Sequence, residues 1–204
     1  MQTLRARAVI ASVAAATVLP LSLGALAPQA LADDTTPVST NASGTPSPFG
    51  PGCSSLPKNG KGSIDAMSKE RVARAAATNP KLTKLALALK DAGLTTKLDD
   101  AKHITVFAPT NEAFDKVPKE KLATLMKDKA QLKKVLTYHV VDKTVTSSEL
   151  PNGSFKTMEG STLKTSGSGT SFKVNDKANI VCGDIRTANA TVYLVDTVLM
   201  PPSS

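Results

Sequence analysis

Few side chains in this sequence are of the types that carry out covalent or metal chemistry. Its 204 residues include two histidines, His103 and His139, and two cysteines, Cys53 and Cys182. A hydrolytic triad needs a nucleophile beside a histidine, and the chain has no G-x-S-x-G nucleophile elbow. Two aspartates precede His103 closely, but a stable cation site would want further ligands. We therefore expect a protein that is not an enzyme, with no catalytic residue, cofactor or metal.

The first 32 residues have the pattern of a secretory signal peptide. Arg5 and Arg7 precede an apolar, alanine-rich segment at residues 9–26, and residues 30–32 match an A-x-A cleavage site. No second apolar run of about 18 residues follows, so we expect no membrane span. The sequence thus predicts a secreted, extracellular protein, with association with the cell wall as a further option.

The two cysteines of an exported chain are expected to pair. A disulfide from Cys53 to Cys182 would join the start of the domain to a late strand. Its effect on the unfolded chain would stabilise the fold by about 3–5 kcal/mol. The alternative, a reactive or metal-binding pair, is less favoured because two distant histidines do not complete a ligand set.

The composition divides the remainder into a linker and one domain. Residues 33–52 are almost entirely Pro, Ser, Thr and Gly and cannot form a core. Residues 53–202 have the length of a single domain, and no internal repeat divides them.

Helical patterns fill the first half of this domain and strand patterns fill the second. We expect helices at residues 68–77, from Asn79-Pro80 to Gly93, from Pro118, and after Asp128 as a cap, with a buried strand at residues 104–108. Strands follow at residues 154–158, 161–165, 171–174, 180–182 and 191–200, separated by turn residues. The last strand is apolar on both faces. The order predicts an α+β domain in which helices cover a mostly antiparallel sheet.

Three separate segments resemble the fasciclin domain family. Residues 105–114 (TVFAPTNEAF) are similar to its first signature, residues 136–141 (LTYHVV) to its tyrosine-histidine motif and residues 188–201 (ANATVYLVDTVLMP) to its second signature. The resemblance implies a wedge of β-sheets flanked by helices, in an extracellular adhesion or matrix protein. The surroundings of both cysteines resemble the secreted single-domain fasciclin antigens of actinobacteria, in which the pair is implied to be bridged.

The sequence departs from the family at one position that bears on function. Many members carry a histidine where this chain has Tyr193, so a role that rests on that histidine does not transfer. Arg-Gly-Asp is absent, and a single domain weakens any bridging role unless the protein oligomerises.

Two groups of residues are candidate sites. The resemblance implies that Tyr138 and His139 form an adhesion motif, whereas their apolar neighbours favour packing in the core. Asp196 falls in the last strand, and a buried carboxylate needs partners. Thr110 and Asn111 of the first signature, or His139, could supply them in a structural polar network.

The charge and the patterns leave two functions open. The formal charge is +8, and without Arg5 and Arg7 it is +6. Many lysines between residues 81 and 134 lie on solvated helical faces or form a basic patch for anionic polymers. We expect no nucleic acid partner, because the chain lacks Trp and an aromatic stacking platform.

The first hypothesis is a monomeric adhesion or interaction module that binds a protein or glycan at the cell surface or matrix. The alternative is a carrier of a small apolar ligand between helices and sheet.

Overall fold

The computed structural model describes residues 47–202, so the expected signal peptide and most of the expected linker lie outside the described residues. The helices are α1 (Ile64–Lys69), α2 (Val72–Thr78), α3 (Thr83–Asp91), α4 (Thr95–Asp100), α5 (Asn111–Asp115), α6 (Lys119–Lys127) and α7 (Lys129–Tyr138), with 3₁₀ turns η1 (Pro51–Ser55) and η2 (Ser147–Glu149). The strands are β1 (Ile104–Pro109), β2 (Val140–Val141), β3 (Ser154–Lys156), β4 (Thr162–Ser168), β5 (Ser171–Val174), β6 (Ala178–Arg186) and β7 (Ala190–Val195).

The expected cap at Asp128 and the expected stop at Gly93 are confirmed, whereas α3 begins at Thr83 and not at Asn79-Pro80. Asp128 accepts hydrogen bonds from two backbone N–H groups at the start of α7, and the Thr110 hydroxyl accepts one, from Ala113, at the start of α5. Gly93, with φ of 66°, follows α3 in the left-handed conformation that glycine adopts readily.

The helix expected at residues 68–77 is instead two short helices, α1 and α2. Glu70 and Arg71 between them are extended. The carbonyl of Glu70 accepts from the Ala188 N–H at 2.8 Å, and the Val72 N–H donates to the Asn189 side chain at 2.9 Å. Contacts with the β6–β7 turn therefore replace helical hydrogen bonds at this break.

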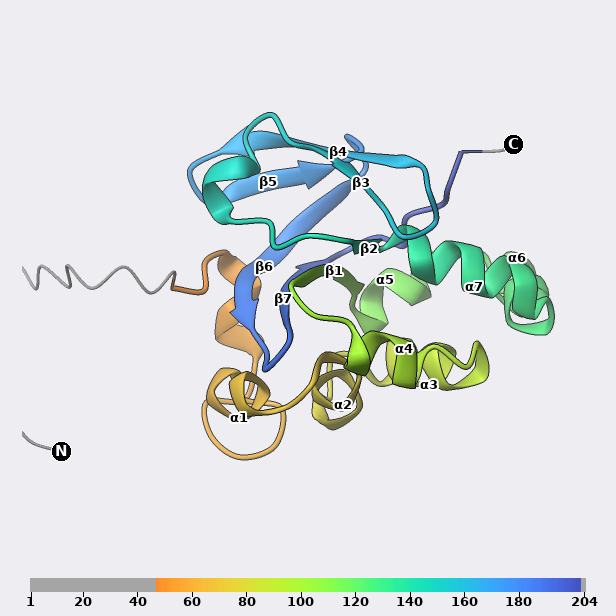
Figure 1. Ribbon diagram of the computed structural model, residues 1–204, viewed down its shortest axis with the longest axis horizontal. Coiled ribbons are helices and arrows are strands. Elements are labelled where there is room, and N and C mark those ends of the chain that lie inside the picture. Colours follow the sequence, from red (N-terminus) through yellow and green to blue (C-terminus); the bar gives the residue numbers. More distant parts are fainter. Residues whose placement is uncertain (1–46, 203–204) are drawn as a thin grey trace, which may run out of the picture. The chain divides into compact units, whose positions relative to one another are not determined.

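The strands within residues 47–202 form one sheet in the order β2-β1-β7-β6-β5-β4-β3 (Figure 1). The β1–β7 pair is parallel and the other pairs are antiparallel. The two ends of the sheet meet, because Val141 forms an antiparallel bridge with Thr157 and the Met158 N–H donates to the Val140 carbonyl at 2.7 Å. The expected α+β class, with a mostly antiparallel sheet, is confirmed.

Strands β1 and β7 are buried on both faces and separate two apolar cores. Val192 and Leu194 face the core beneath the helices, whereas Tyr193 and Val195 face the core enclosed by the curled sheet. Figure 1 shows α1 to α4 on one side of β1 and β7 and strands β3 to β5 on the other. The expectation that this last strand is apolar on both faces is confirmed.

The folded part begins earlier than the expected boundary at residue 53. Phe49 forms an antiparallel bridge with Gly183, and its ring lies 5.5 Å from that of Phe172. A Cβ atom on Gly50 would lie 2.6 Å from the Val181 carbonyl oxygen, so only glycine lets the segment pass this close to β6. The end of the expected linker is thus part of the domain.

Candidate functional site

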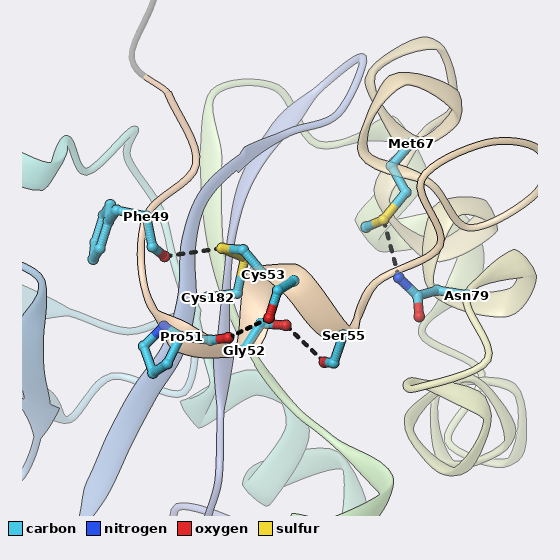
Figure 2. Close-up of a disulfide and its surroundings, with 9 residues drawn as sticks. Phe49, Pro51, Gly52, Cys53, Ser55, Met67, Asn79 and Cys182 are labelled. Atoms are coloured by element: carbon cyan, nitrogen blue, oxygen red, sulfur yellow. Dashed lines mark hydrogen bonds between the residues drawn. A yellow bond between two sulfur atoms is a disulfide. The ribbon is translucent and has the colours of Figure 1, made fainter.

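Cys53 and Cys182 form a disulfide that ties the N-terminal segment to β6 (Figure 2). Their Cα atoms are 4.8 Å apart, although 129 positions separate them in sequence. The carbonyl oxygen of Phe49 lies 3.0 Å from the Cys53 sulfur, so the bridge and the start of the domain are in direct contact. Cys182 is buried in the helix-side core.

Tyr138 and His139, the candidate adhesion motif, lie inside the domain at the end of α7. Their exposed fractions are 3% and 2%. The Tyr138 hydroxyl donates to the Thr162 carbonyl at 3.3 Å and accepts from the Asn175 amide at 2.7 Å. Its partners therefore belong to β4 and to the turn after β5. Tyr193, at the position where many relatives carry histidine, is also buried.

The two ring nitrogens of His139 both have backbone partners. Nδ1 lies 2.8 Å from the Val135 carbonyl oxygen, and Nε2 accepts from the Leu199 N–H at 2.9 Å. An accepting Nε2 places the proton on Nδ1 and leaves the ring neutral. Burial lowers the pKa of His139 to about 4, although the bond to Val135 acts in the opposite direction. The geometry is that of a structural histidine.

Thr110 and Asn111 bind different parts of the fold. The Thr110 hydroxyl accepts from the Ala113 N–H, and its own N–H donates to the Val195 carbonyl at 3.1 Å. The Asn111 side chain accepts from the Lys84 N–H at 3.0 Å and thereby holds the start of α3. The first signature thus joins β1, α3, α5 and the end of β7.

Asp196 does not contact the side chains of the first signature. It follows β7 directly, and its side chain is 23% exposed. Its carboxylate accepts from the Asn179 N–H at 2.8 Å, from the Asn179 amide at 3.0 Å and from Lys116 at 3.0 Å. Burial alone would raise the pKa of Asp196, but these hydrogen bonds and one from Thr197 outweigh it and lower that pKa. The expected single network is divided because β7 ends before residue 196.

An open groove of about 600 Å³ lies where the β6–β7 turn meets the loop before β1. Its walls are formed by Arg71, Asp99, Asp100, Lys102, His103, Thr144, Arg186, Thr187, Ala188, Asn189, Ala190 and Thr191. Two of its carboxylates already have partners, because Asp99 accepts from the Ala73 N–H at 2.9 Å and Asp100 pairs with Arg71 at 3.1 Å. No cluster of three metal-ligating side chains occurs within residues 47–202.

Lys102 and Arg186 give this groove positive charge that its carboxylates do not neutralise. Lys102 is exposed and takes part in no ion pair within residues 47–202. The Arg186 side chain is 47% exposed, and its Nε lies 4.0 Å from the carboxylate of Asp184, too far for a hydrogen bond. The groove can therefore offer donors to a carboxylate or hydroxyl group of a partner.

Asn189 organises the groove, a role that nothing in the sequence assigns to it. Its side-chain oxygen accepts from the Val72 N–H at 2.9 Å. Its amide donates to the carbonyls of Leu98 and Ala101, both at 2.8 Å. The one feature of the sequence that could have indicated this role is that Asn189 is a short polar residue in a turn between two expected strands.

The interface between helices and sheet is filled. A hollow between α2, α3, α4 and the β1–β7 pair has a volume of about 10 Å³ and only apolar walls. That is room for about one water molecule.

A curled, mostly antiparallel sheet with helices against its parallel strand pair defines a disulfide-tied α+β wedge domain. The family model of the fasciclin domain matches residues 80–201. The chain belongs to the fasciclin domain family.

Curated relatives agree with this assignment and with the expected resemblance to actinobacterial antigens. The cell surface glycolipoprotein MPB83 of Mycobacterium bovis is 40% identical over 177 residues, which are 82% of this chain and 79% of that protein. The immunogenic protein MPB70 of the same species is 40% identical over 162 residues, 76% of this chain and 82% of that protein. Human periostin is 38% identical over 103 residues, half of this chain and 12% of periostin.

The fold is also that of a solved structure, the FAS1 domain pair of the insect cell adhesion molecule fasciclin I. The TM-score is 0.56 at 16% identity, over 67% of this chain and 52% of that pair, so the chain spans about half of it. Within residues 47–202, no helix combines the length and hydropathy needed to cross a membrane. In keeping with its cell-surface and matrix relatives, the protein is secreted and extracellular.

Proposed function

We propose that this protein is a non-enzymatic adhesion or interaction module that binds an extracellular protein or glycan. The observation that supports this proposal most is the contrast between two hollows of the domain. The groove at the β6–β7 turn is open, polar and about 600 Å³, whereas the apolar hollow beneath the helices is about 10 Å³. Sites for small apolar ligands have volumes of about 300–1,000 Å³. This contrast favours surface recognition over the alternative, a carrier of a small apolar ligand.

We propose that Tyr138 and His139 support adhesion through the fold and not by contact with a partner. Both side chains are buried, and their polar atoms are hydrogen-bonded to the domain itself. Lys102 and Arg186 of the groove are the residues that we assign to partner binding, because both are exposed and neither donates a hydrogen bond to a carboxylate of the domain.

Binding of the secreted protein to intact cells and to immobilised extracellular matrix tests the proposal. Wild type should bind saturably, and the double substitution Lys102→Ala/Arg186→Ala should weaken binding by about tenfold. A matched control, Arg74→Ala/Lys90→Ala, removes the same charge from exposed positions outside the groove and should bind like wild type. Equal losses in both variants would show that the groove is not the site.

Native mass spectrometry of the secreted protein separates the two candidate functions. We propose that the signal peptide is cleaved after residue 32, that a linker begins at residue 33 and that the protein is a monomer. The spectrum should then show a single species with the mass of a chain that begins at Asp33, less the two hydrogens lost on disulfide formation. A co-purifying small molecule would instead support the carrier.

A further inference from the structure

We propose that the α6–α7 hairpin, residues 119–138, is a docking surface for a linear anionic glycan that bears carboxylate or sulfate groups. The inference rests on the proposed adhesion function and names the chemistry of the partner. It concerns a surface separate from the groove, since no residue of the hairpin lines that groove.

The hairpin concentrates the positive charge of the domain. Residues 47–202 contain all charged residues except Arg5, Arg7, Asp33 and Asp34, which leaves 23 basic and 15 acidic side chains and a net charge of +8. The hairpin has two acidic residues and six lysines, so it supplies +4. The lysines are Lys119, Lys121, Lys127, Lys129, Lys133 and Lys134. All six are exposed, and the ion pairs within residues 47–202 include none of them.

The acidic residues of the hairpin do little to neutralise this field. Asp128 accepts from the N–H groups of Ala130 and Gln131, each at 3.0 Å, so its carboxylate is directed to the α7 backbone. Glu120, the other acidic residue, is exposed and lines a hollow together with Lys121, but its single charge offsets only one of the six lysines. The net charge of the hairpin is therefore positive and can attract a polyanion.

Two of the lysines, Lys129 and Lys133, lie where they do not help α7. Lys129 occupies the first residue of α7, where the helix dipole disfavours a cation, and the first turn has no acidic residue. Lys129 and Lys133 are four residues apart, a spacing at which like charges repel by a few tenths of a kcal/mol. A sequence that breaks local rules in this way is typical of a functional surface.

Open hollows beside the lysines offer polar groups for sugar hydroxyls. One, of about 330 Å³, is lined in part by Lys121, Thr124 and Gln131. A second, of about 480 Å³, is lined in part by Lys134 and Glu159, and both hollows share Gln131 and Met200. Figure 1 shows α6 and α7 side by side at one edge of the sheet, with α6 the more distant from β2.

The hairpin suits a glycan better than a lipid surface or a nucleic acid. Leu122, Leu125 and Met126 of α6 pack against the helix-side core, so no apolar face is free to enter a bilayer. Its one aromatic residue, Tyr138, is buried and cannot stack on bases. Its cations are all lysines, which lack the bidentate fork that arginine offers to phosphate.

The experiment measures binding of the secreted protein to heparin and to polygalacturonate at several NaCl concentrations. The test variant is K121Q/K127Q/K133Q/K134Q. The matched control is K156Q/K164Q/K173Q/K177Q, which removes four exposed lysines from the β3–β5 region. We expect wild type to bind at least one of the two glycans. The test variant should bind about tenfold more weakly at 0.1 M NaCl, with a shallower salt dependence, and the control should change less than about threefold. Because the four substituted lysines form none of the ion pairs within residues 47–202, and Gln and Lys have similar helix propensities, the test variant should melt close to the wild-type temperature.

Three results would overturn the proposal. They are equal losses in both variants, no binding of wild type to either glycan, and stronger binding to vesicles of 30% phosphatidylglycerol in phosphatidylcholine than to the glycans. Cell binding then separates this inference from the proposed function. If the test variant still binds cells saturably, the adhesion function stands and the hairpin is not the site of cell binding. If the wild-type protein does not bind cells at all, both the adhesion function and the hairpin proposal are wrong.

Discussion

The Nε2 atom of His139 accepts a hydrogen bond from the Leu199 N–H at 2.9 Å. The same residue accepts, through its carbonyl, from the Phe107 N–H at 2.8 Å. One buried histidine thus connects the end of α7 with β1 and with the segment after β7. The tyrosine-histidine motif consequently joins three parts of the domain and depends on a neutral imidazole.

We predict that acid destabilises the protein through His139. Its pKa is about 4 in the folded state and 6.5 in a model peptide, so the unfolded chain binds the extra proton first. The stabilisation is complete above pH 6.5 and is lost as the pH falls towards 4. Urea titrations should show the free energy of unfolding falling by about 2 kcal/mol between pH 7 and pH 5.

Two variants assign this slope to one histidine. His103→Gln removes the exposed histidine and should leave the slope unchanged. His139→Asn should lower stability at pH 7 and abolish most of the slope between pH 7 and 5. A slope that survives in His139→Asn would contradict the assignment.

Asp196→Ala should destabilise the domain by about 1 kcal/mol, because it removes two hydrogen bonds from Asn179 to a carboxylate, although both are exposed and water can replace the acceptor. The exposed ion pair contributes little, so Lys116→Ala should cost less than about 0.5 kcal/mol. Thermal melts of both variants at pH 7 check the difference. An unchanged melting temperature for Asp196→Ala would show that its hydrogen bonds do not stabilise the fold.

The fold class and the burial of both faces of the last strand could be predicted from the sequence, because both follow from the short-range periodicity of apolar residues. Asp128 was recognisable as a helix cap for the same reason. The break between α1 and α2 was not predictable, since it depends on the Asn189 side chain more than 100 positions away. Asp196 was misplaced because apolar alternation continues past the residue at which β7 ends.

Less of the candidate site than of the fold could be predicted from the sequence. Tyr138 and His139 stood out as a motif, yet burial and hydrogen bonding are properties of their tertiary neighbours. The groove brings Lys102 and Arg186 together from distant segments, and no local pattern reports that proximity. The abundance of lysines between residues 81 and 134 was visible in the sequence, whereas their concentration on the α6–α7 hairpin and the absence of ion pairs there, within residues 47–202, required the structure.

Removal of the disulfide should lower the free energy of unfolding by about 3–5 kcal/mol, because the unfolded chain loses a long closed loop. Cys53→Ala/Cys182→Ala, which leaves no unpaired thiol, is the variant to measure by urea denaturation.

In the same variant Phe49 should become more mobile, since the disulfide lies directly beside it. Hydrogen exchange at the Phe49 and Gly183 N–H groups, which bond to each other's carbonyls, would report the change. Unaltered exchange would show that packing alone holds the segment.

Asp184→Asn should stabilise the protein. Asp184 is 2% exposed, and its Oδ2 has no hydrogen-bond partner within residues 47–202. Burial raises the pKa of its carboxyl group, although the charge of Arg186 acts against this rise, so the ionised form is disfavoured in the fold. Asparagine keeps the shape and tolerates the left-handed backbone, with φ of 56°, at this position. We expect a gain of about 1 kcal/mol in unfolding free energy at pH 7.

The pH dependence of that gain distinguishes the cause. A raised carboxyl pKa means that wild type loses stability as the pH rises through the folded-state value. The advantage of Asp184→Asn over wild type should therefore shrink between pH 7 and pH 4, where Asp184 takes up its proton. Asp184→Ala, which strains the left-handed backbone and leaves a cavity, should be less stable than Asp184→Asn at both values. A destabilising Asp184→Asn at pH 7 would show instead that the carboxylate itself, through its charge near Arg186, supports the groove.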